Sequence, residues 1–331
     1  MTSSKNIAVY GAYGHTGRFV VQELRRRGWT PICSGRDPEK LKMLAGLETR
    51  VAAIDDPASL DRALAGAAAV INCAGPFLDT GAALVEAALR ARIPYLDIAA
   101  EQAAAQAVFE SYGARVREAK IIAVPAMAFY GGLGDLLATA AMGDWKEADE
   151  ILIAVALDSW HPTDGTRKTG ERNTVTRVVV SGGKLVPHAA SERQWDFPPP
   201  FGTQDVVGVP LTEIITISRH LHAGEVRSFM NLAPLNDLGK DDTPSPKLSE
   251  DGRSEQVFLV DVIVRNGGKT RRAFATGRDI YAVTAPLVVE AMERILENPQ
   301  REHGVFAPGE LFDAKAFLAA LSPAHLTFEM A

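Results

Sequence analysis

Three glycines in one short segment have the spacing of a phosphate-binding loop. The segment reads Tyr10-Gly11-Ala12-Tyr13-Gly14-His15-Thr16-Gly17 and lies between an apolar run at 6–10 and a helical pattern at about 15–27. Such a loop turns tightly, brings its backbone close to a pyrophosphate and directs the first amides of a helix at it. We therefore predict that all of Gly11 to Gly17 contact a dinucleotide. The alternative is a glycine-rich turn without a ligand.

The end of the next apolar run indicates which dinucleotide is bound. It reads Cys33-Ser34-Gly35-Arg36-Asp37. NAD sites place an acidic residue here for the ribose 2′-hydroxyl, whereas a basic residue accommodates the 2′-phosphate of NADP. Ser34 and Arg36 suit the phosphate, and Asp37 before Pro38 suits a helix cap. We predict NADP(H), with a merely solvated Arg36 as the alternative.

Two further strand ends supply cofactor candidates. Asp55 follows the third strand and could accept a hydrogen bond from the adenine amine, or cap the helix that begins at Pro57. The fourth strand ends in Asn72-Cys73-Ala74-Gly75-Pro76-Phe77. In a doubly wound sheet this edge borders the ligand crevice, so Cys73 to Pro76 are predicted to lie beside the cofactor, with Gly75 leaving room for a ribose. Cys73 is interpreted as a small buried side chain rather than a nucleophile.

The candidates for chemistry on a substrate are less sharply defined. The segment 160–172 is predicted to be a loop between two strands, with Arg167, Lys168 and Arg172 able to hold a carboxylate and His161 able to act as an acid or base. Its alternative is a solvated hairpin. Asp97 and Glu101 follow the fifth strand and could orient the nicotinamide or a substrate amine, or cap the next helix. We take His161, Lys168 and Asp97 as the candidate catalytic residues.

Several common catalytic motifs are absent from the sequence. No tyrosine has a lysine four residues later, which excludes the acid–base pair of short-chain dehydrogenases. Neither His-Glu-x-x-His nor Cys-x-x-Cys occurs, so no metal is expected. His220 and His222 are interpreted as a surface pair. Hydride transfer requires little covalent work from the protein, so this does not argue against an enzyme.

The elements that must position these residues divide the chain in two. Up to about residue 125, short apolar runs at 6–10, 29–34, 51–54, 69–73, 95–98 and 121–124 alternate with helical patterns, which predicts a Rossmann-type doubly wound parallel sheet. From about 150, runs with polar alternation and turns at 181–183 and 266–268 predict an inserted α+β domain with a largely antiparallel sheet. We assign 1–130 and 280–331 to the first domain and 131–279 to the second, which we expect to bind the substrate.

Composition narrows the class of protein. The 331 residues carry 35 Lys and Arg against 41 Asp and Glu, a net charge of −6, which does not favour nucleic acid as a partner. Only Cys33 and Cys73 are present, so no disulfide framework is expected. The sequence shows neither a signal peptide nor an apolar run long enough to span a membrane, and we expect a cytoplasmic protein.

The motifs together resemble the saccharopine dehydrogenase-like oxidoreductases. The resemblance rests on Gly11–Gly17, Ser34-Gly35-Arg36, Asn72–Phe77, Tyr95-Leu96-Asp97 and Glu101, and more weakly on 125–135, Gly165-Thr166 and Gly277-Arg278-Asp279. It implies an NADP-binding Rossmann domain and a mixed-sheet domain through which two copies form a homodimer. Members often carry Pro-Gly-x-Gly near the end of the sixth strand, where this chain has Pro125-Ala126-Met127-Ala128.

This changed loop leads into Phe129 and Tyr130, which we expect to line the substrate site between the domains. We predict an NADP(H)-dependent oxidoreductase that transfers hydride to or from an amino-acid-like or imine substrate. Two alternatives stay open: an NADPH-binding sensor without turnover, and an enoyl reductase acting on acyl lipids.

Overall fold

The structure is a computed structural model that describes residues 5–249, 252–298 and 301–331. The chain forms two compact units, each built from three separate segments. The first unit comprises Met1–Ala128, Gly165–Asn173 and Thr284–Phe306, and the second comprises Phe129–Asp164, Thr174–Val283 and Ala307–Ala331. Within the described residues, no helix is both long and apolar enough to cross a membrane.

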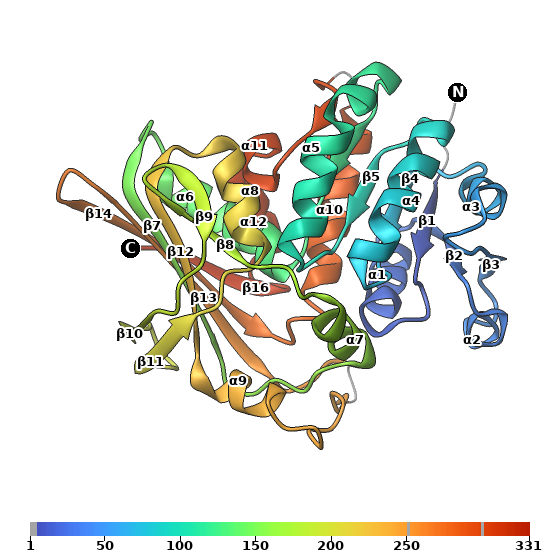
Figure 1. Cartoon of the computed structure of the whole chain (residues 1–331). Coiled ribbons are helices and arrows are strands. Elements are labelled where there is room, and N and C mark those ends of the chain that lie inside the picture. The colour runs from blue at the N-terminus through green and yellow to red at the C-terminus, as the bar shows by residue number, and fades with distance from the viewer. Residues whose placement is uncertain (1–4, 250–251, 299–300) are drawn as a thin grey trace. The chain divides into compact units, whose positions relative to one another are not determined.

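The first unit is the predicted doubly wound parallel sheet (Figure 1). Its seven strands have the order β15-β6-β5-β4-β1-β2-β3. They are β1 (Asn6–Tyr10), β2 (Thr30–Gly35), β3 (Glu48–Val51), β4 (Ala69–Asn72), β5 (Tyr95–Asp97), β6 (Ile122–Val124) and β15 (Gly304–Val305). The chain returns past β1 between β3 and β4, so the strand order reverses between β1 and β4. This reversal is where open α/β sheets bind their ligands.

Helices connect these strands and cover the sheet. They are α1 (His15–Arg26), α2 (Pro38–Lys42), α3 (Pro57–Leu64), α4 (Phe77–Ala91), α5 (Gln102–Ala119) and α10 (Thr284–Glu297). Ile7, Ala8 and Val9 of the central strand β1 are fully buried, as expected of a strand covered on both faces. Because both faces of the sheet are covered, its strands are continuous apolar runs rather than alternating apolar and polar residues.

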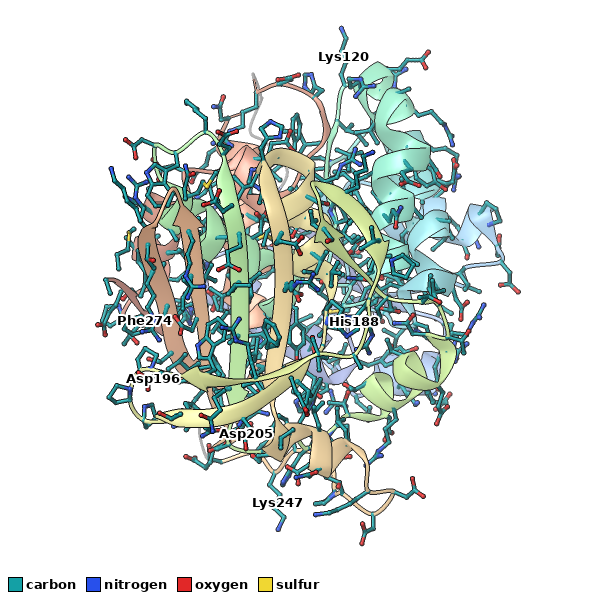
Figure 2. The ribbon with its side chains drawn as sticks, turned by 60° about the vertical axis from the view of Figure 1, so that its left-hand side comes forward. Lys120, His188, Asp196, Asp205, Lys247 and Phe274 are labelled. Atoms are coloured by element: carbon teal, nitrogen blue, oxygen red, sulfur yellow. The ribbon has the colours of Figure 1, made fainter. Side chains whose placement is uncertain are left out.

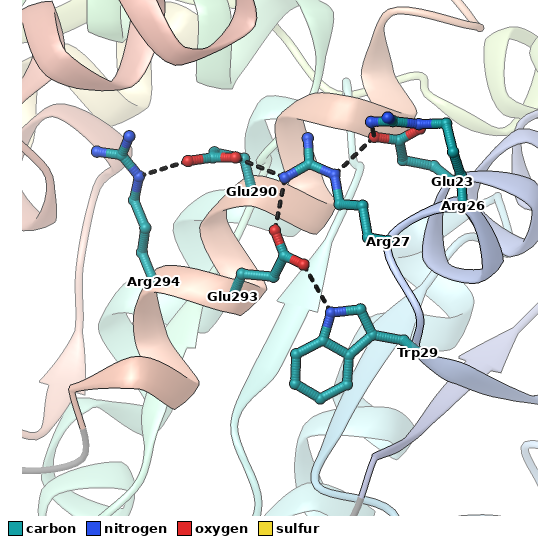
Figure 3. Close-up of polar contacts among 7 residues, drawn as sticks. All are labelled: Glu23, Arg26, Arg27, Trp29, Glu290, Glu293 and Arg294. Atoms are coloured by element: carbon teal, nitrogen blue, oxygen red, sulfur yellow. Dashed lines mark hydrogen bonds and ion pairs between the residues drawn. The ribbon is translucent and has the colours of Figure 1, made fainter.

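An ion-pair network joins α10 to α1, although their residues are far apart in the chain (Figure 3). Arg27 donates from Nε to Glu23 at 2.7 Å, and from Nη1 to Glu290 at 2.6 Å and Glu293 at 2.5 Å. The Trp29 indole donates to the other oxygen of Glu293 at 2.6 Å. These contacts explain why Thr284–Phe306 belongs to the first unit.

The second unit is built on a nine-stranded mixed sheet. Its main path is β10-β11-β12-β7-β13-β14-β16, with β8 and β9 as a side branch. The strands are β7 (Ala148–Leu157), β8 (Val178–Ser181), β9 (Lys184–Pro187), β10 (Glu192–Asp196), β11 (Thr203–Gly208), β12 (Ala223–Asn231), β13 (Val257–Asn266), β14 (Lys269–Arg278) and β16 (Leu326–Met330). The β7–β12 pair is parallel and the other described ladders are antiparallel. The expected largely antiparallel sheet is therefore confirmed.

Helices and an aromatic cluster complete this unit. The helices are α6 (Gly134–Met142), α8 (Thr212–His220), α9 (Leu232–Leu238), α11 (Pro308–Leu311) and α12 (Ala314–Leu321). Trp195, Phe197 and Phe229 pack together in one cluster of the core. Figure 2 shows the sheet with Asp196 and Asp205 on the β10–β11 hairpin.

The structure departs from the sequence expectations in three places. Residues 160–172 are not a loop, because Asp164–Arg172 form helix α7 and most of it clusters with the first unit. Residues 307–331 belong to the second unit, since β16 pairs with β14. The sequence pattern predicts a helix over residues 82–91, but α4 begins at Phe77, where a distant side chain accepts a hydrogen bond from the Phe77 amide.

Candidate functional site

The glycine loop after β1 leaves no room for side chains. Gly11 has φ +83°, and its amide donates to the Ser34 carbonyl at 2.8 Å. A Cβ on Gly11 would lie 2.9 Å from the Cβ of Ala74. A Cβ on Gly17 would lie 2.2 Å from the Gly11 carbonyl oxygen, closer than any real contact. Both glycines are therefore required by the packing of the loop itself.

Helix α1 begins without a side-chain cap. Its N-cap is Gly14, which has no side chain, and its first turn carries no acidic residue. The first amides of a helix have no partner within the helix, and the helix dipole adds partial positive charge there. The loop thus presents a helix start suited to a phosphate, as the glycine spacing predicted.

The end of β2 offers one exposed cation. Arg36 is exposed, and its guanidinium has no hydrogen bond or ion pair with any other residue that the structure describes. Asp37 accepts from the amides of Glu39 and Lys40, so the interpretation of Asp37 as a helix cap is confirmed. Ser34 is 1% exposed and donates to the Arg50 carbonyl at 2.8 Å. The Ser34 hydroxyl is therefore engaged within the fold, whereas the Arg36 side chain is exposed.

The same edge carries an aromatic ring and a second cation. The Tyr13 ring packs on Gly35, where a Cβ would lie 2.5 Å from the ring carbon Cε1. Lys40 Nζ lies 5.9 Å from the centroid of the Tyr13 ring. Lys40 could not be recognised as a cofactor candidate from the sequence, because only the folded position of α2 brings it near Tyr13.

Asp55 does not cap α3. The N-cap is its neighbour Asp56, whose carboxylate accepts from the Ser59 amide at 3.1 Å. Asp55 is exposed after β3. The helix-cap alternative for Asp55 is therefore wrong, and its contact with the adenine amine stays a prediction.

The turn after β4 is held by a small polar network. Asn72 accepts from the Ala74 amide at 3.0 Å, and Thr80 donates to the Ala74 carbonyl at 2.7 Å. Burial raises the pKa of the Cys73 thiol, which agrees with its interpretation as unreactive. A Cβ on Gly75 would lie 2.8 Å from Thr169 Oγ1 of α7, so Gly75 makes room for this helix.

Asp97 is buried and fully engaged. One carboxylate oxygen accepts from the amides of Ala99 at 3.0 Å and Ala126 at 2.8 Å, and the other accepts from the Tyr95 hydroxyl at 2.9 Å. Burial raises its pKa, and these hydrogen bonds oppose the rise. Asp97 thus joins β5 to the turn at Ala126 and is a positioning residue by its contacts.

The turn at Ala126 has the backbone conformation that a glycine would favour, although an alanine occupies it. Ala126 has φ +57°, in the left-handed region that favours glycine, which fits the glycine of the family pattern. An L-residue with a Cβ pays about 1–2 kcal/mol there. The Asp97 hydrogen bond to the Ala126 amide helps to hold this strained turn.

Glu101 caps a neighbouring helix rather than its own. It is the N-cap residue of α5, but its carboxylate Oε1 accepts from the Phe77 amide at the start of α4, at 2.8 Å. Its side chain is buried, and Oε2 has no hydrogen-bond partner among the described residues. Burial raises the pKa of the Glu101 carboxyl.

Helix α7 brings the predicted basic residues to the first unit. Arg172 pairs with Asp79 of α4 at 3.0 Å, and Thr169 contacts Gly75. Lys168 is exposed and Arg167 is half-buried on the same helix. His161 lies just before α7 in the second unit.

Phe129 and Tyr130 belong to the second unit and start a short π-helical turn, Phe129–Leu133. Their rings pack edge to face at 4.9 Å, and both side chains are buried. The Tyr130 hydroxyl is buried without a hydrogen-bond partner in the described part of the chain. Burial raises its pKa well above the usual value, so it stays protonated. Short π-helical turns are frequent at functional sites.

His220 is not a surface residue. Its Nε2 lies 2.7 Å from a carboxylate oxygen of Asp135, which is fully buried and also accepts from the Gly309 amide at 2.8 Å. Among the residues that the structure describes, no group of three His, Cys, Asp or Glu side chains could hold a metal ion.

Comparison with known proteins identifies the first unit. Residues 7–124 match the family model of the saccharopine dehydrogenase NADP binding domain. A saccharopine dehydrogenase-like oxidoreductase of Rattus norvegicus is 27% identical over 224 residues, which cover 57% of this chain and 52% of the relative. A probable mitochondrial saccharopine dehydrogenase-like oxidoreductase of Arabidopsis thaliana is 29% identical over 143 residues, covering 38% and 32%. The chain thus spans about a third to a half of the length of these relatives.

Several solved structures match almost the whole chain. Saccharopine dehydrogenase (L-Glu forming) from Saccharomyces cerevisiae is 14% identical with a TM-score of 0.67, covering 98% of this chain and 99% of that chain. At this identity the match shows the fold. Together the comparisons confirm the resemblance found in the sequence, the two-domain fold class and NADP(H) as the cofactor.

Proposed function

We propose that this chain, whose residues 7–124 belong to the saccharopine dehydrogenase NADP-binding domain family, transfers hydride between NADP(H) and an amino-acid-like or imine substrate. The observation that carries the proposal is the pairing of an uncapped helix start after β1 with the exposed, unpaired Arg36 after β2. The first suits a pyrophosphate and the second a 2′-phosphate, and both lie at the carboxyl edge of the same sheet.

The residues present fit the cofactor. The amides of His15 to Gly17 would receive the pyrophosphate, whereas the Gly14 amide donates to the Gly11 carbonyl at 2.9 Å. Arg36 would receive the 2′-phosphate, and Lys40 adds positive charge beside Tyr13. Asp55 would meet the adenine amine. When bound, NADPH supplies the hydride, and the protein's task is to align the reacting atoms and exclude water.

For the substrate, we propose that α7 supplies the charge. Lys168 and Arg167 would hold a carboxylate, with Arg172 kept in place by Asp79. His161 would exchange a proton with the substrate, and Phe129 and Tyr130 would form an apolar wall. Asp97, with its three hydrogen bonds, would position the surrounding backbone. A homodimer formed through the second sheet and a cytoplasmic location belong to the same proposal, although one relative is named as mitochondrial.

Calorimetric titration with NADPH and NADH tests the cofactor part. We expect the wild type to bind NADPH more tightly than NADH. Arg36→Gln should weaken the affinity for NADPH by about 10- to 100-fold and leave the affinity for NADH unchanged, since a charge-assisted contact contributes about 1.5–3 kcal/mol. Asp37→Ser is the matched control, because serine can still cap α2. Tighter binding of NADH, or no binding of either nucleotide, would overturn the proposal.

The substrate part is tested with the double variant Arg167→Ala, Lys168→Ala. We expect a higher KM for a carboxylate-bearing substrate, found by screening amines and oxo acids, with NADPH affinity unchanged. An unchanged KM would exclude α7 as the carboxylate site. Selective NADPH binding without turnover of any amine, oxo acid or enone would instead favour a sensor.

A further inference from the structure

Glu101 occupies the edge of the sheet where β4 and β5 end. It follows β5 by four residues, and its Oε1 accepts from the Phe77 amide in the turn after β4, at 2.8 Å. The side chain is 1% exposed. One carboxylate oxygen is therefore fixed by the start of α4, at the carboxyl ends of two neighbouring strands.

The fold accounts only in part for the second oxygen of this carboxylate, because the amides of Ala100 and Glu101 act on the carboxyl group and oppose the rise in its pKa that burial causes. Oε2 is buried and has no hydrogen-bond partner among the described residues. Leaving a polar atom buried and unpaired is costly, and more so for a charged group. Capping α4 needs only one acceptor, which the amide oxygen of glutamine would also supply. A carboxylate rather than an amide at this position points to a partner that is not part of this chain.

The order of the strands shows which part of the cofactor comes closest. The 2′-phosphate end is assigned to Arg36 after β2, and the pyrophosphate to the loop after β1. Because the sheet order is β5-β4-β1-β2, the remaining half of an extended dinucleotide lies over β4 and β5. That half carries the nicotinamide ring.

We propose that the Glu101 carboxylate faces the nicotinamide and favours NADP⁺ over NADPH. This inference rests on the proposed function for the direction in which the cofactor lies. The nicotinamide ring carries a positive charge only in the oxidised form, and a buried carboxylate attracts it strongly because the surroundings screen charge poorly. Glu101 would thereby stabilise the charge that the ring develops as it gives up hydride.

Titration of three ligands into the wild type and Glu101→Gln tests this role. The ligands are NADP⁺, NADPH and 2′-phospho-ADP-ribose, which lacks the nicotinamide. Burial raises the pKa of Glu101, with Asp97 adding to it, so the titrations are run at pH 8.5 to favour the ionised carboxyl. Glu118→Gln, on the exposed surface of α5, is the matched control.

We expect Glu101→Gln to weaken the affinity for NADP⁺ by about tenfold relative to that for NADPH. The affinity for 2′-phospho-ADP-ribose should stay unchanged, and Glu118→Gln should bind all three ligands as the wild type does. An unchanged ratio of the NADP⁺ and NADPH affinities would overturn the inference, as would equal weakening of all three ligands, which marks a structural role alone. If the wild type binds none of the three, the proposed function itself fails.

Discussion

Replacing Arg27 with glutamine should destabilise the first unit by about 3 kcal/mol, an estimate that follows from its contacts. The Arg27 side chain is 14% exposed and pairs with Glu23, Glu290 and Glu293, which are 8%, 14% and 19% exposed. Each carboxylate keeps one other partner: Arg26, Arg294 and Trp29 respectively. We therefore assign about 1 kcal/mol to each lost contact rather than the full cost of an unpaired buried charge.

The pKa of Glu23 supports this magnitude. Burial raises it, but hydrogen bonds from Arg26 and Arg27 outweigh burial and lower it from 4.5 to about 2. This lowering corresponds to about 3 kcal/mol, to which both Arg26 and Arg27 contribute. Because the folded carboxylate has the lower pKa, its stabilisation is present above pH 4.5 and is lost as the pH falls towards 2.

Urea unfolding followed by circular dichroism at pH 7 and pH 3 measures the effect. Hydrogen exchange of the α1 and α10 amides assigns the loss to the first unit. Arg27→Gln should lower the free energy of unfolding by about 3 kcal/mol at pH 7 and by clearly less at pH 3. Lys42→Gln breaks the exposed Lys42–Glu39 pair and should lower the free energy of unfolding by under about 0.5 kcal/mol. A loss below 1 kcal/mol for Arg27→Gln, or an equal loss at both pH values, would refute the reasoning.

Two further changes test other parts of the structure. Burial lowers the pKa of His220, but Asp135 raises it by more, so the stabilisation from the charged pair is full below pH 6.5 and is lost as the pH rises through the raised pKa. His220→Gln should therefore lower the free energy of unfolding by about 1–2 kcal/mol more at pH 6 than at pH 9, measured by thermal unfolding. An equal loss at both pH values would contradict this assignment. Gly17→Ala places a Cβ 2.2 Å from the Gly11 carbonyl and should weaken NADPH binding at least about tenfold in a titration, whereas Gly113→Ala, on α5, should bind as the wild type does. Unchanged NADPH affinity in Gly17→Ala would show that the loop adjusts without loss.

The sequence by itself determined the parallel sheet, the glycine loop and the cap at Asp37. These features are local, because apolar runs, glycine spacing and an Asp-Pro pair act over fewer than about ten residues. The cofactor class followed from the same short segments, and the family comparison agrees with it. Local patterns failed where two neighbours are chemically alike: Asp56, and not Asp55, has the position that caps α3.

The tertiary structure alone decided the roles that depend on distant partners. Asp97 holds the strained turn at Ala126, Glu101 caps the start of α4 at Phe77, and Arg27 reaches across to α10. It also decided that α7 belongs with the first unit and that β16 completes the second sheet. The physical reason is that a buried carboxylate or an edge strand takes whichever hydrogen-bond partner the fold brings to it, and no local pattern names that partner.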